Sequence, residues 1–319
     1  MEFVIVFVIL MALELIYFRV ADKFNIIDKP NERSSHKNIT LRGGGIIFYF
    51  SVLIYFIYHG LSYPWFFLGL TLMAIISFLD DIFTLSNKIR LLIHFSSVLL
   101  LSYELDLFNF PWYYLLITFI IIVGVINAYN FMDGINGITV SYSLSILILL
   151  YMVNLSLNFV SQELIIYVSL GVLIFGIFNF RIKAKSFAGD VGSVSIAYIL
   201  LFLIGLLIMK TGNFIYILLL SVYGIDAVWT IIRRLIHGEN IFKAHRSHLY
   251  QYLANEAKIN KLVISTCYGV TQLIVGILVF QIVEMSPKIQ ILFALSILCI
   301  ISVVYLLIKG YIIKKYIKI

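Results

Sequence analysis

Residues 192–209 read GSVSIAYILLFLIGLLIM, a stretch without a single charged side chain. A helix needs about 20 mainly apolar residues to cross the hydrocarbon core of a bilayer. Runs near that length also occur at 3–19, 46–60, 64–79, 90–104, 111–127, 138–155, 162–178, 213–231, 262–283 and 288–308. These runs predict an all-α integral membrane protein with about eleven transmembrane helices.

The overall composition agrees with a chain whose main solvent is lipid. Hydrophobic residues make up 62% of the sequence and charged residues 12%, whereas charged residues are about a quarter of a typical soluble protein. The apolar runs leave no stretch long enough to bury a separate aqueous core. We therefore expect residues 1–319 to form one polytopic membrane domain.

The distribution of positive charge predicts the orientation. With eleven spans and the N-terminus outside, 21 of the 23 Lys and Arg residues fall on the inner side, and only Lys210 and Lys288 remain outside. Positive charge concentrates in cytoplasmic loops, so we expect a cytoplasmic C-terminus and a site on the cytoplasmic loops. The sequence pI of about 9.2 reflects this bias. It does not indicate nucleic acid, although anionic lipid or a phosphate substrate remains an alternative use of the charge.

Two adjacent carboxylates, Asp80 and Asp81, end the third predicted span, with Lys88 and Arg90 shortly after them. Carboxylates at membrane depth are expensive and are usually functional. Adjacent carboxylates repel each other unless a cation or proton relieves them, which suits a Mg²⁺ site or a proton acceptor. A solvated helix end is the alternative interpretation.

The fifth predicted span runs into a polar segment with Asn127, Asn130, Asp133 and Asn136 at three-residue intervals. A helix would place these side chains on one face. Carboxamides and a carboxylate can bind the ribose and base edges of a nucleotide. A turn after the span would explain the glycines at 134 and 137, but not this spacing.

The eighth predicted span is preceded by Gly189-Asp190-Val191-Gly192-Ser193. Such a turn at a helix start offers free backbone N–H groups for phosphate and one carboxylate for a metal. Alternatively, Asp190 is only an N-terminal cap of the helix.

The longest inner loop holds His245-Arg246-Ser247-His248. Arginine clamps phosphate oxygens and histidine can relay a proton, so the loop suits a diphosphate. Two histidines without a cysteine or a third histidine nearby argue against zinc. The first inner loop adds further donors at 30–36 and a glycine run at 43–45, for substrate or for lipid headgroups.

The same loops carry motifs in a fixed order: Pro-x-x-Arg-x-Ser-His at 30–36 with the glycine run, Asp-Asp-x(6)-Lys at 80–88, Asn-Ala-x-Asn-x-x-Asp-Gly at 127–134, Gly-Asp-x-Gly-Ser at 189–193, and the histidine loop. Each motif alone is weak. Together, over almost the full length, the chain resembles the polyprenyl-phosphate N-acetylhexosamine-1-phosphate transferases. This family includes initiators of O-antigen and teichoic acid linkage synthesis and the muramoyl-pentapeptide translocase.

The resemblance implies a bacterial inner-membrane enzyme that moves N-acetylhexosamine 1-phosphate from a UDP-amino sugar to undecaprenyl phosphate and releases UMP. It implies Mg²⁺, with Mn²⁺ as an alternative, and Asp190 as a metal ligand. The expected catalytic residues are Asp80, Asp81 and His248. The expected substrate-binding residues are Lys88, Asn130, Asp133, Asn179, Phe187, His245 and Arg246.

The chain departs from the family pattern in places. Asn136 stands where the family often has Asp, and the stretch from His248 to Gln251 stands where it often has His-x-His-His, so only His248 carries over. The His-Arg-Ser-His-x-Tyr-Gln version resembles a branch that starts O-antigen or capsule chains with N-acetylated hexosamines, often 6-deoxy sugars.

Two other classes of function stay open. A transporter or flippase would carry polar groups near mid-span, for which Glu14 and Asp226 are the candidates. A non-catalytic scaffold would bind polyprenyl phosphate for an assembly complex. Membrane lipids and a second copy of the chain are the remaining expected partners.

Overall fold

The computed structural model describes residues 1–28, 39–83, 85–241 and 245–317. In this part of the chain the fold is helical, apart from two short strands, which confirms the predicted all-α class. The long helices are α1 (Glu2–Lys23), α2 (Ile46–Tyr58), α3 (Pro64–Phe83), α4 (Asn87–Glu104), α5 (Trp112–Met132), α6 (Ile138–Leu157), α7 (Gln162–Asn179), α8 (Gly189–Thr211), α9 (Ser221–Ile236), α11 (Lys261–Ile282) and α12 (Pro287–Ile312).

Shorter elements complete the chain. The strands are β1 (Ile27–Asp28) and β2 (Thr40–Leu41), and α10 (Leu249–Gln251) is a single helical turn in the histidine loop. One 3-10 helix, η1 (Leu107–Asn109), precedes α5, and another, η2 (Phe214–Leu220), leads directly into α9. Two π-helical turns, η3 (Tyr252–Glu256) and η4 (Ile313–Ile317), follow α10 and α12.

Each predicted span coincides with a helix, but fewer helices meet the requirements for a membrane crossing. In the described residues, nine helices are long and apolar enough. Helix α2 has only 13 residues, and α4 carries Lys88, Arg90 and His94 in its first turns. The predicted number of eleven crossings and their orientation therefore stay predictions.

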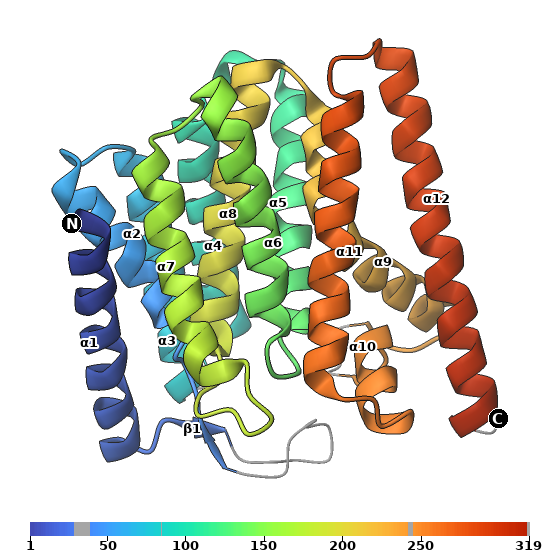
Figure 1. The fold of residues 1–319 in the computed structure, drawn as a ribbon, viewed down its shortest axis with the longest axis horizontal. Coiled ribbons are helices and arrows are strands. Elements are labelled where there is room, and N and C mark those ends of the chain that lie inside the picture. The colour runs from blue at the N-terminus through green and yellow to red at the C-terminus, as the bar shows by residue number, and fades with distance from the viewer. Residues whose placement is uncertain (29–38, 84, 242–244, 318–319) are drawn as a thin grey trace.

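The polar loops gather at one end of the helix bundle. Figure 1 shows the N-terminus at the upper end of α1 and the C-terminus at the lower end of α12. The same lower end holds β1, α10 and the connections from α5 to α6 and from α7 to α8 (Figure 1). The predicted site residues lie in these connections, in the histidine loop and at the helix ends of this side, so the fold brings them to one face.

Helix α8 lies at the centre of the bundle. It is apolar on all sides, and 83% of its apolar window is buried against α2, α3, α5 and α6, as expected for a helix without a polar face. Helix α12 is the opposite case, with only 6% buried. Its apolar side chains therefore face outward, where a lipid environment would cover them.

Two glycines let α2 approach the start of α8 closely. A Cβ atom built on Gly45 would lie 2.4 Å from the Cα atom of Gly192. Backbone bonds join the same elements, because the N–H groups of Gly44 and Gly45 donate to the carbonyls of Phe187 and Ala188 at 2.9 and 3.2 Å. The glycine run thus fixes the position of the α8 N-terminus.

The two strands anchor this junction from the other side. Ile27 pairs with Leu41 in an antiparallel ladder, and the Leu41 carbonyl accepts a hydrogen bond from the Phe187 N–H at 2.8 Å. The segment before α8 is therefore held between the glycine run and β2. The predicted Pro30–His36 motif lies outside the described residues.

Candidate active site

Carboxylates from α3 and α8 meet two arginines at the polar end of the bundle. Arg42, which follows β2, places Nη2 at 2.7 Å from Asp81 Oδ1 and at 3.1 Å from Asp190 Oδ1. Arg90, in the first turn of α4, places Nη1 at 2.7 Å from Asp80 Oδ2 and Nη2 at 3.9 Å from Asp190 Oδ2. The predicted grouping of Asp80, Asp81 and Asp190 is thus present, with two arginines that were not predicted as site residues.

Asp81 also caps the N-terminus of α8. Its carboxylate accepts the backbone N–H groups of Asp190 and Val191, both at 3.1 Å, which have no partner inside the helix. Gly189 has a φ of +70°, and a Cβ atom there would lie 2.6 Å from Asp81 Oδ2. Gly189, the first glycine of the Gly-Asp-x-Gly-Ser motif, is therefore required for the contact between α3 and α8.

The three carboxylates differ in exposure. The Asp81 side chain is fully buried, that of Asp80 is 11% exposed and that of Asp190 is 23% exposed. Asp80 accepts the Leu85 N–H at 2.8 Å in addition to Arg90. Asp81 therefore links the elements of the site, whereas Asp80 and Asp190 remain accessible to a ligand.

Lys88 lies at an exposed position in the first turn of α4. In the described part of the chain, Arg90 rather than Lys88 forms the ion pair with Asp80. Lys88 lies close in sequence to the carboxylates and is free to turn toward a larger ligand. Its predicted role in phosphate binding stays a prediction.

Arg42 is charged under all ordinary conditions. Burial favours its neutral form, but the carboxylates of Asp81 and Asp190 outweigh burial and raise the pKa of the guanidinium. Arg42 therefore supplies a permanent positive charge between two carboxylates.

The end of α5 adds the predicted nucleotide-binding residues. Asn130 Nδ2 donates to Ser193 Oγ at 3.2 Å, so it lies beside the first turn of α8. Asp133 Oδ1 accepts a bond from Thr139 Oγ1 at 2.6 Å. Burial raises the pKa of Asp133 to about 6, with a smaller contribution from Asp190, while Thr139 and Arg42 act in the opposite direction.

The predicted single polar face from residue 127 to residue 136 is wrong. Helix α5 ends at Met132, so Asp133 and Asn136 lie in the following loop. Asn127 is exposed and donates to the Val123 carbonyl one turn earlier. Asn136 is buried and donates to the carbonyls of Arg181 and Ile182 at 2.7 and 3.1 Å, which gives it a structural role.

Asn179 connects the loop between α5 and α6 to the segment before α8. Asn179 Oδ1 accepts the Gly137 N–H at 2.7 Å, and its Nδ2 donates to the Ser186 carbonyl at 2.9 Å. Phe187 is half-buried, and its backbone binds Leu41 and Gly44. Asn179 therefore lies next to the predicted nucleotide site and links the α5–α6 loop to the α7–α8 loop.

The histidine loop packs onto the end of α5. The rings of His245 and His248 lie 6.0 and 6.2 Å from the Phe131 ring, measured between centroids. Tyr250 donates to the Phe131 carbonyl at 2.8 Å. The loop is therefore joined to the residue that directly follows Asn130.

Individual residues of this loop have different partners. His245 Nδ1 lies 3.0 Å from Ser247 Oγ, and burial, then His248, lowers the pKa of His245 to about 4. His245 is therefore neutral at pH 7. Arg246, predicted to clamp phosphate, forms an ion pair with Glu256 at 2.6 Å.

His248 is almost fully buried and pairs with a carboxylate from α9. Its Nδ1 atom lies 3.1 Å from Asp226 Oδ1. Asp226 is visible in the sequence only as an isolated carboxylate in a predicted span, and no sequence spacing links it to the histidine loop. The sequence likewise does not distinguish Arg42 and Arg90 from the many other basic residues of the inner loops.

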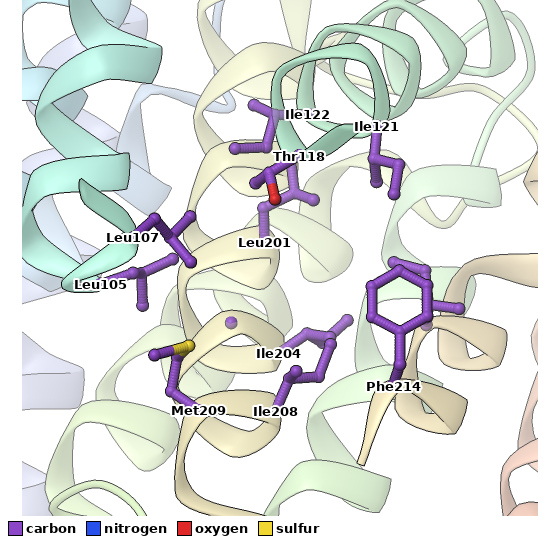
Figure 2. Close-up of a pocket in the computed structure, with 12 residues that line it drawn as sticks. Leu105, Leu107, Thr118, Ile121, Ile122, Leu201, Ile204, Ile208, Met209 and Phe214 are labelled. Atoms are coloured by element: carbon purple, nitrogen blue, oxygen red, sulfur yellow. The ribbon is translucent and has the colours of Figure 1, made fainter. Parts of the chain in front are cut away.

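An apolar pocket lies at the other end of α8 (Figure 2). Helix α8 begins at Gly189 and ends at Thr211, and the pocket is lined near that far end by Ile204, Ile208 and Met209. Among the described residues that line it, Thr118 supplies the only hydroxyl group. The pocket is therefore separate from the carboxylate and arginine site.

The donor chemistry of the site fits a hard cation. Mg²⁺ prefers carboxylate oxygens and often keeps several waters and substrate phosphates as its other ligands. In the described residues no three His, Cys, Asp or Glu side chains form a closed metal site. Asp190 and Asp80, which are partly exposed, are the residues able to contribute oxygen ligands to such an open site.

Comparison with known proteins gives matches that include these residues. The model of glycosyl transferase family 4 matches residues 63–209, a range that contains Asp80, Asp81, Asn130, Asp133 and Asp190.

Relatives extend the match beyond that range. A probable undecaprenyl-phosphate N-acetylglucosaminyl 1-phosphate transferase of Bacillus subtilis is 29% identical over 258 residues, covering 74% of this chain and 71% of the relative. An undecaprenyl-phosphate alpha-N-acetylglucosaminyl 1-phosphate transferase of Escherichia coli K12 is 28% identical and covers 74% and 71%. A phospho-N-acetylmuramoyl-pentapeptide-transferase of Thermotoga maritima is 26% identical and covers 68% and 77%. With the ordered motifs and the converging carboxylates, these matches support the resemblance to glycosyl transferase family 4 that the motifs predict.

Proposed function

We propose that the protein transfers an N-acetylhexosamine 1-phosphate from a UDP-linked donor to undecaprenyl phosphate at the cytoplasmic face of a bacterial inner membrane. The observation that carries the proposal is the convergence of Asp80, Asp81 and Asp190 with Arg42 and Arg90 at one end of an apolar helix bundle. Phosphoryl transfer depends mainly on positioning and on the neutralisation of phosphate charge. The relatives from Bacillus subtilis and Escherichia coli are named as undecaprenyl-phosphate N-acetylglucosaminyl 1-phosphate transferases, which supports this acceptor.

The reaction balances without a further reactant. An oxygen of the lipid phosphate attacks the β-phosphorus of the donor, which bears the sugar. The bond from that phosphorus to the oxygen bridging to the α-phosphate breaks, and this oxygen leaves with UMP. The product is polyprenyl-diphospho-sugar, and direct in-line attack requires no covalent enzyme intermediate.

The exposure of each carboxylate suggests its part in the reaction. Asp80, which keeps access to a ligand, orients the lipid phosphate, while buried Asp81 holds α8 in place through two backbone N–H groups. Arg42 and Arg90 can turn from the carboxylates to the diphosphate when the donor binds. When bound at Asp190, Mg²⁺ or Mn²⁺ neutralises phosphate charge.

The donor's nucleotide is expected near Asn130 and Asp133, beside the first turn of α8. The histidine loop has the sequence His-Arg-Ser-His-x-Tyr-Gln, which resembles the branch of the family that uses N-acetylated and often 6-deoxy hexosamines. This resemblance supports a donor sugar of that kind. The product would then start an O-antigen, a capsule or a related cell-envelope polysaccharide.

The transporter alternative loses one of its two mid-span carboxylates. Asp226 is engaged by His248, Leu249 and Tyr268 at 3.1, 3.1 and 2.7 Å. A carboxylate held in this way is not available along a translocation path. Glu14 alone does not support transport.

The experiment is a measurement of UMP release by the purified protein in detergent, with undecaprenyl phosphate, Mg²⁺ and a panel of UDP-N-acetylhexosamines. We expect release that requires the lipid and stops with EDTA or in Asp190→Asn. Asp106→Asn is the matched control, because it changes the same group at the opposite end of the bundle, in a left-handed conformation that Asn adopts readily. Folded protein that binds the lipid but releases no UMP from any donor would favour the scaffold.

A further inference from the structure

A buried network connects three helices to the histidine loop. Asp226 in α9 is 1% exposed. Its Oδ1 atom accepts bonds from His248 Nδ1 and the Leu249 N–H, both at 3.1 Å, and from Thr230 Oγ1 at 3.2 Å. Its Oδ2 atom accepts a bond from the Tyr268 hydroxyl in α11 at 2.7 Å.

The carboxylate determines which nitrogen of His248 carries a proton. A carboxylate only accepts hydrogen bonds, and it already receives one from the Leu249 N–H, so the His248 nitrogen facing it must be the protonated one. Nδ1 therefore carries a proton whether the ring is neutral or charged. Any proton that His248 gains or loses is then exchanged at Nε2.

The His248 Nε2 atom is the part of this network for which the described residues supply no partner. It is buried and has no hydrogen-bond partner among the residues that the structure describes. An unpaired buried polar atom destabilises a fold, and a catalytic role is one explanation for keeping it. The aromatic rings around it, those of Phe131, His245 and Tyr250, belong to the candidate active site.

Lys309, another charged residue near His248, is connected to the ring through Asp226. Lys309 in α12 donates to Thr230 Oγ1 at 3.1 Å and also binds the Tyr305 hydroxyl. Thr230 in turn bonds to Asp226. His245, on the other side of the His248 ring, is neutral at pH 7 because burial and His248 lower its pKa to about 4. The network therefore brings a hydroxyl donor, and through it the positive charge of Lys309, to the carboxylate that faces His248.

We propose that Asp226 is a positioning residue, which fixes the His248 ring with Nδ1 protonated and thereby makes Nε2 the atom that exchanges a proton or a hydrogen bond with the bound substrate. This proposal rests on the proposed function for the identity of the substrate, a phosphate or hydroxyl group of the donor or acceptor. The arrangement of the ring itself does not depend on it. Because Nε2 is buried, neighbouring side chains have to shift when the substrate binds.

The first test reads the ring directly. Protein with ¹⁵N-labelled histidine is compared with His248→Gln to assign the ring signals, in a titration continued until the ring signals no longer change with rising pH. We expect a neutral ring with the proton on Nδ1 in the wild type and on Nε2 in Asp226→Asn, since a carboxamide can donate to Nδ1. A wild-type ring protonated on Nε2 would overturn the proposal, whatever the protein's activity.

The second test separates positioning from stability. Asp226→Asn should lower kcat by about 10²- to 10⁴-fold while KM for the donor and the thermal midpoint change little. Tyr198→Phe is the matched control, because it removes a buried hydrogen bond outside the network, the one from the Tyr198 hydroxyl to the Ser97 carbonyl, and should leave both kcat and the tautomer close to wild type. Equal losses of kcat in the two variants, in step with equal losses of thermal stability, would show that Asp226 is only structural.

Discussion

At the scale of single residues, Arg42 is the centre of the proposed site, because one guanidinium nitrogen contacts both Asp81 and Asp190. Without it, Asp81 loses its ion pair and Asp190 keeps only the longer one to Arg90, at 3.9 Å. Removing a preorganised charged donor commonly costs about 10²- to 10³-fold in turnover.

We therefore expect Arg42→Gln to lower kcat/KM by about 10²-fold and to lower the thermal midpoint, with part of that midpoint restored by added Mg²⁺. Turnover and thermal unfolding with and without Mg²⁺ check this. Arg19→Gln, the same charge change on an exposed residue of α1, is the control. If both variants show the same kcat/KM and the same thermal midpoint, Arg42 has no specific role in the site.

Asp133 gives the site a pH dependence in the acid range. Its pKa of about 6 lies above the ordinary value because of burial, so the carboxylate is lost as the pH falls through about 6. If nucleotide binding requires the carboxylate, activity has an acid limb there.

Thr139→Val removes the hydroxyl group that donates to Asp133 at 2.6 Å. A hydrogen bond to a charged group contributes about 1.5–3 kcal/mol, so its loss should raise the pKa of Asp133 and move the acid limb upward by about one unit or more. The pH profile of kcat/KM is the measurement, and Thr266→Val on an exposed face of α11 is the control. An unmoved acid limb would mean that another group sets it.

The sequence distinguishes the acidic residues of the candidate site but not their partners. Asp80, Asp81 and Asp190 are set apart because carboxylates are rare in apolar chains, and the structure brings them together as expected. Arg42 and Asp226 were not predicted as site residues. One arginine in a basic loop resembles the charges that orient the protein, and the Asp226–His248 contact is created only by tertiary packing.

At the scale of elements, the start of α8 is held by close backbone contacts rather than by side chains. Gly45 and Gly192 leave no room for a Cβ atom between α2 and α8. Since Asp81 caps α8 and Asp190 lies in its first turn, a small displacement of α8 would separate the site carboxylates.

Gly45→Ala should therefore destabilise the protein by about 1–3 kcal/mol, as overpacking does, and should lower activity more than the loss of folded protein explains. The thermal midpoint and the activity per folded molecule are measured together. Gly124→Ala on α5 is the control, because no atom lies within 4 Å of the added Cβ and alanine favours a helix. Equal behaviour of the two variants would contradict the role given to this contact.

The α5 boundary shows what periodicity alone cannot supply. Three-residue spacing predicted one polar face from Asn127 to Asn136, but the helix ends at Met132 and Asn136 binds the carbonyls of residues 181 and 182. The spacing contains no information on where the chain leaves the helix. That boundary depends on contacts with the α7–α8 connection, which is distant in sequence.

At the scale of the whole molecule, the orientation is the main expectation still to be tested. The polar loops share one end of the bundle (Figure 1), and 21 of the 23 Lys and Arg residues were assigned to the inner side. Two positions distinguish the sides: Lys183 in the α7–α8 connection and Lys210 in the last turn of α8.

In a variant lacking Cys267 and Cys299, a membrane-impermeant maleimide added to right-side-out vesicles should label Lys210→Cys and not Lys183→Cys. Opening the vesicles should expose Lys183→Cys. The Cys-free parent reports background labelling. The reverse pattern would place the site on the outer side and remove the access to cytoplasmic UDP-sugars on which the proposed function depends.

The most direct test of the central claim follows the phosphorus atoms of the donor. Purified protein is incubated with undecaprenyl phosphate, Mg²⁺ and a UDP-N-acetylhexosamine carrying ³²P in the β-phosphate, and the lipid and aqueous products are separated. Transfer of the sugar 1-phosphate predicts that the label moves into the lipid product while unlabelled UMP is released. Label that stays in water as UDP while the sugar moves to the lipid would contradict phosphoryl transfer, because the bond broken would then be that between the sugar and the β-phosphate.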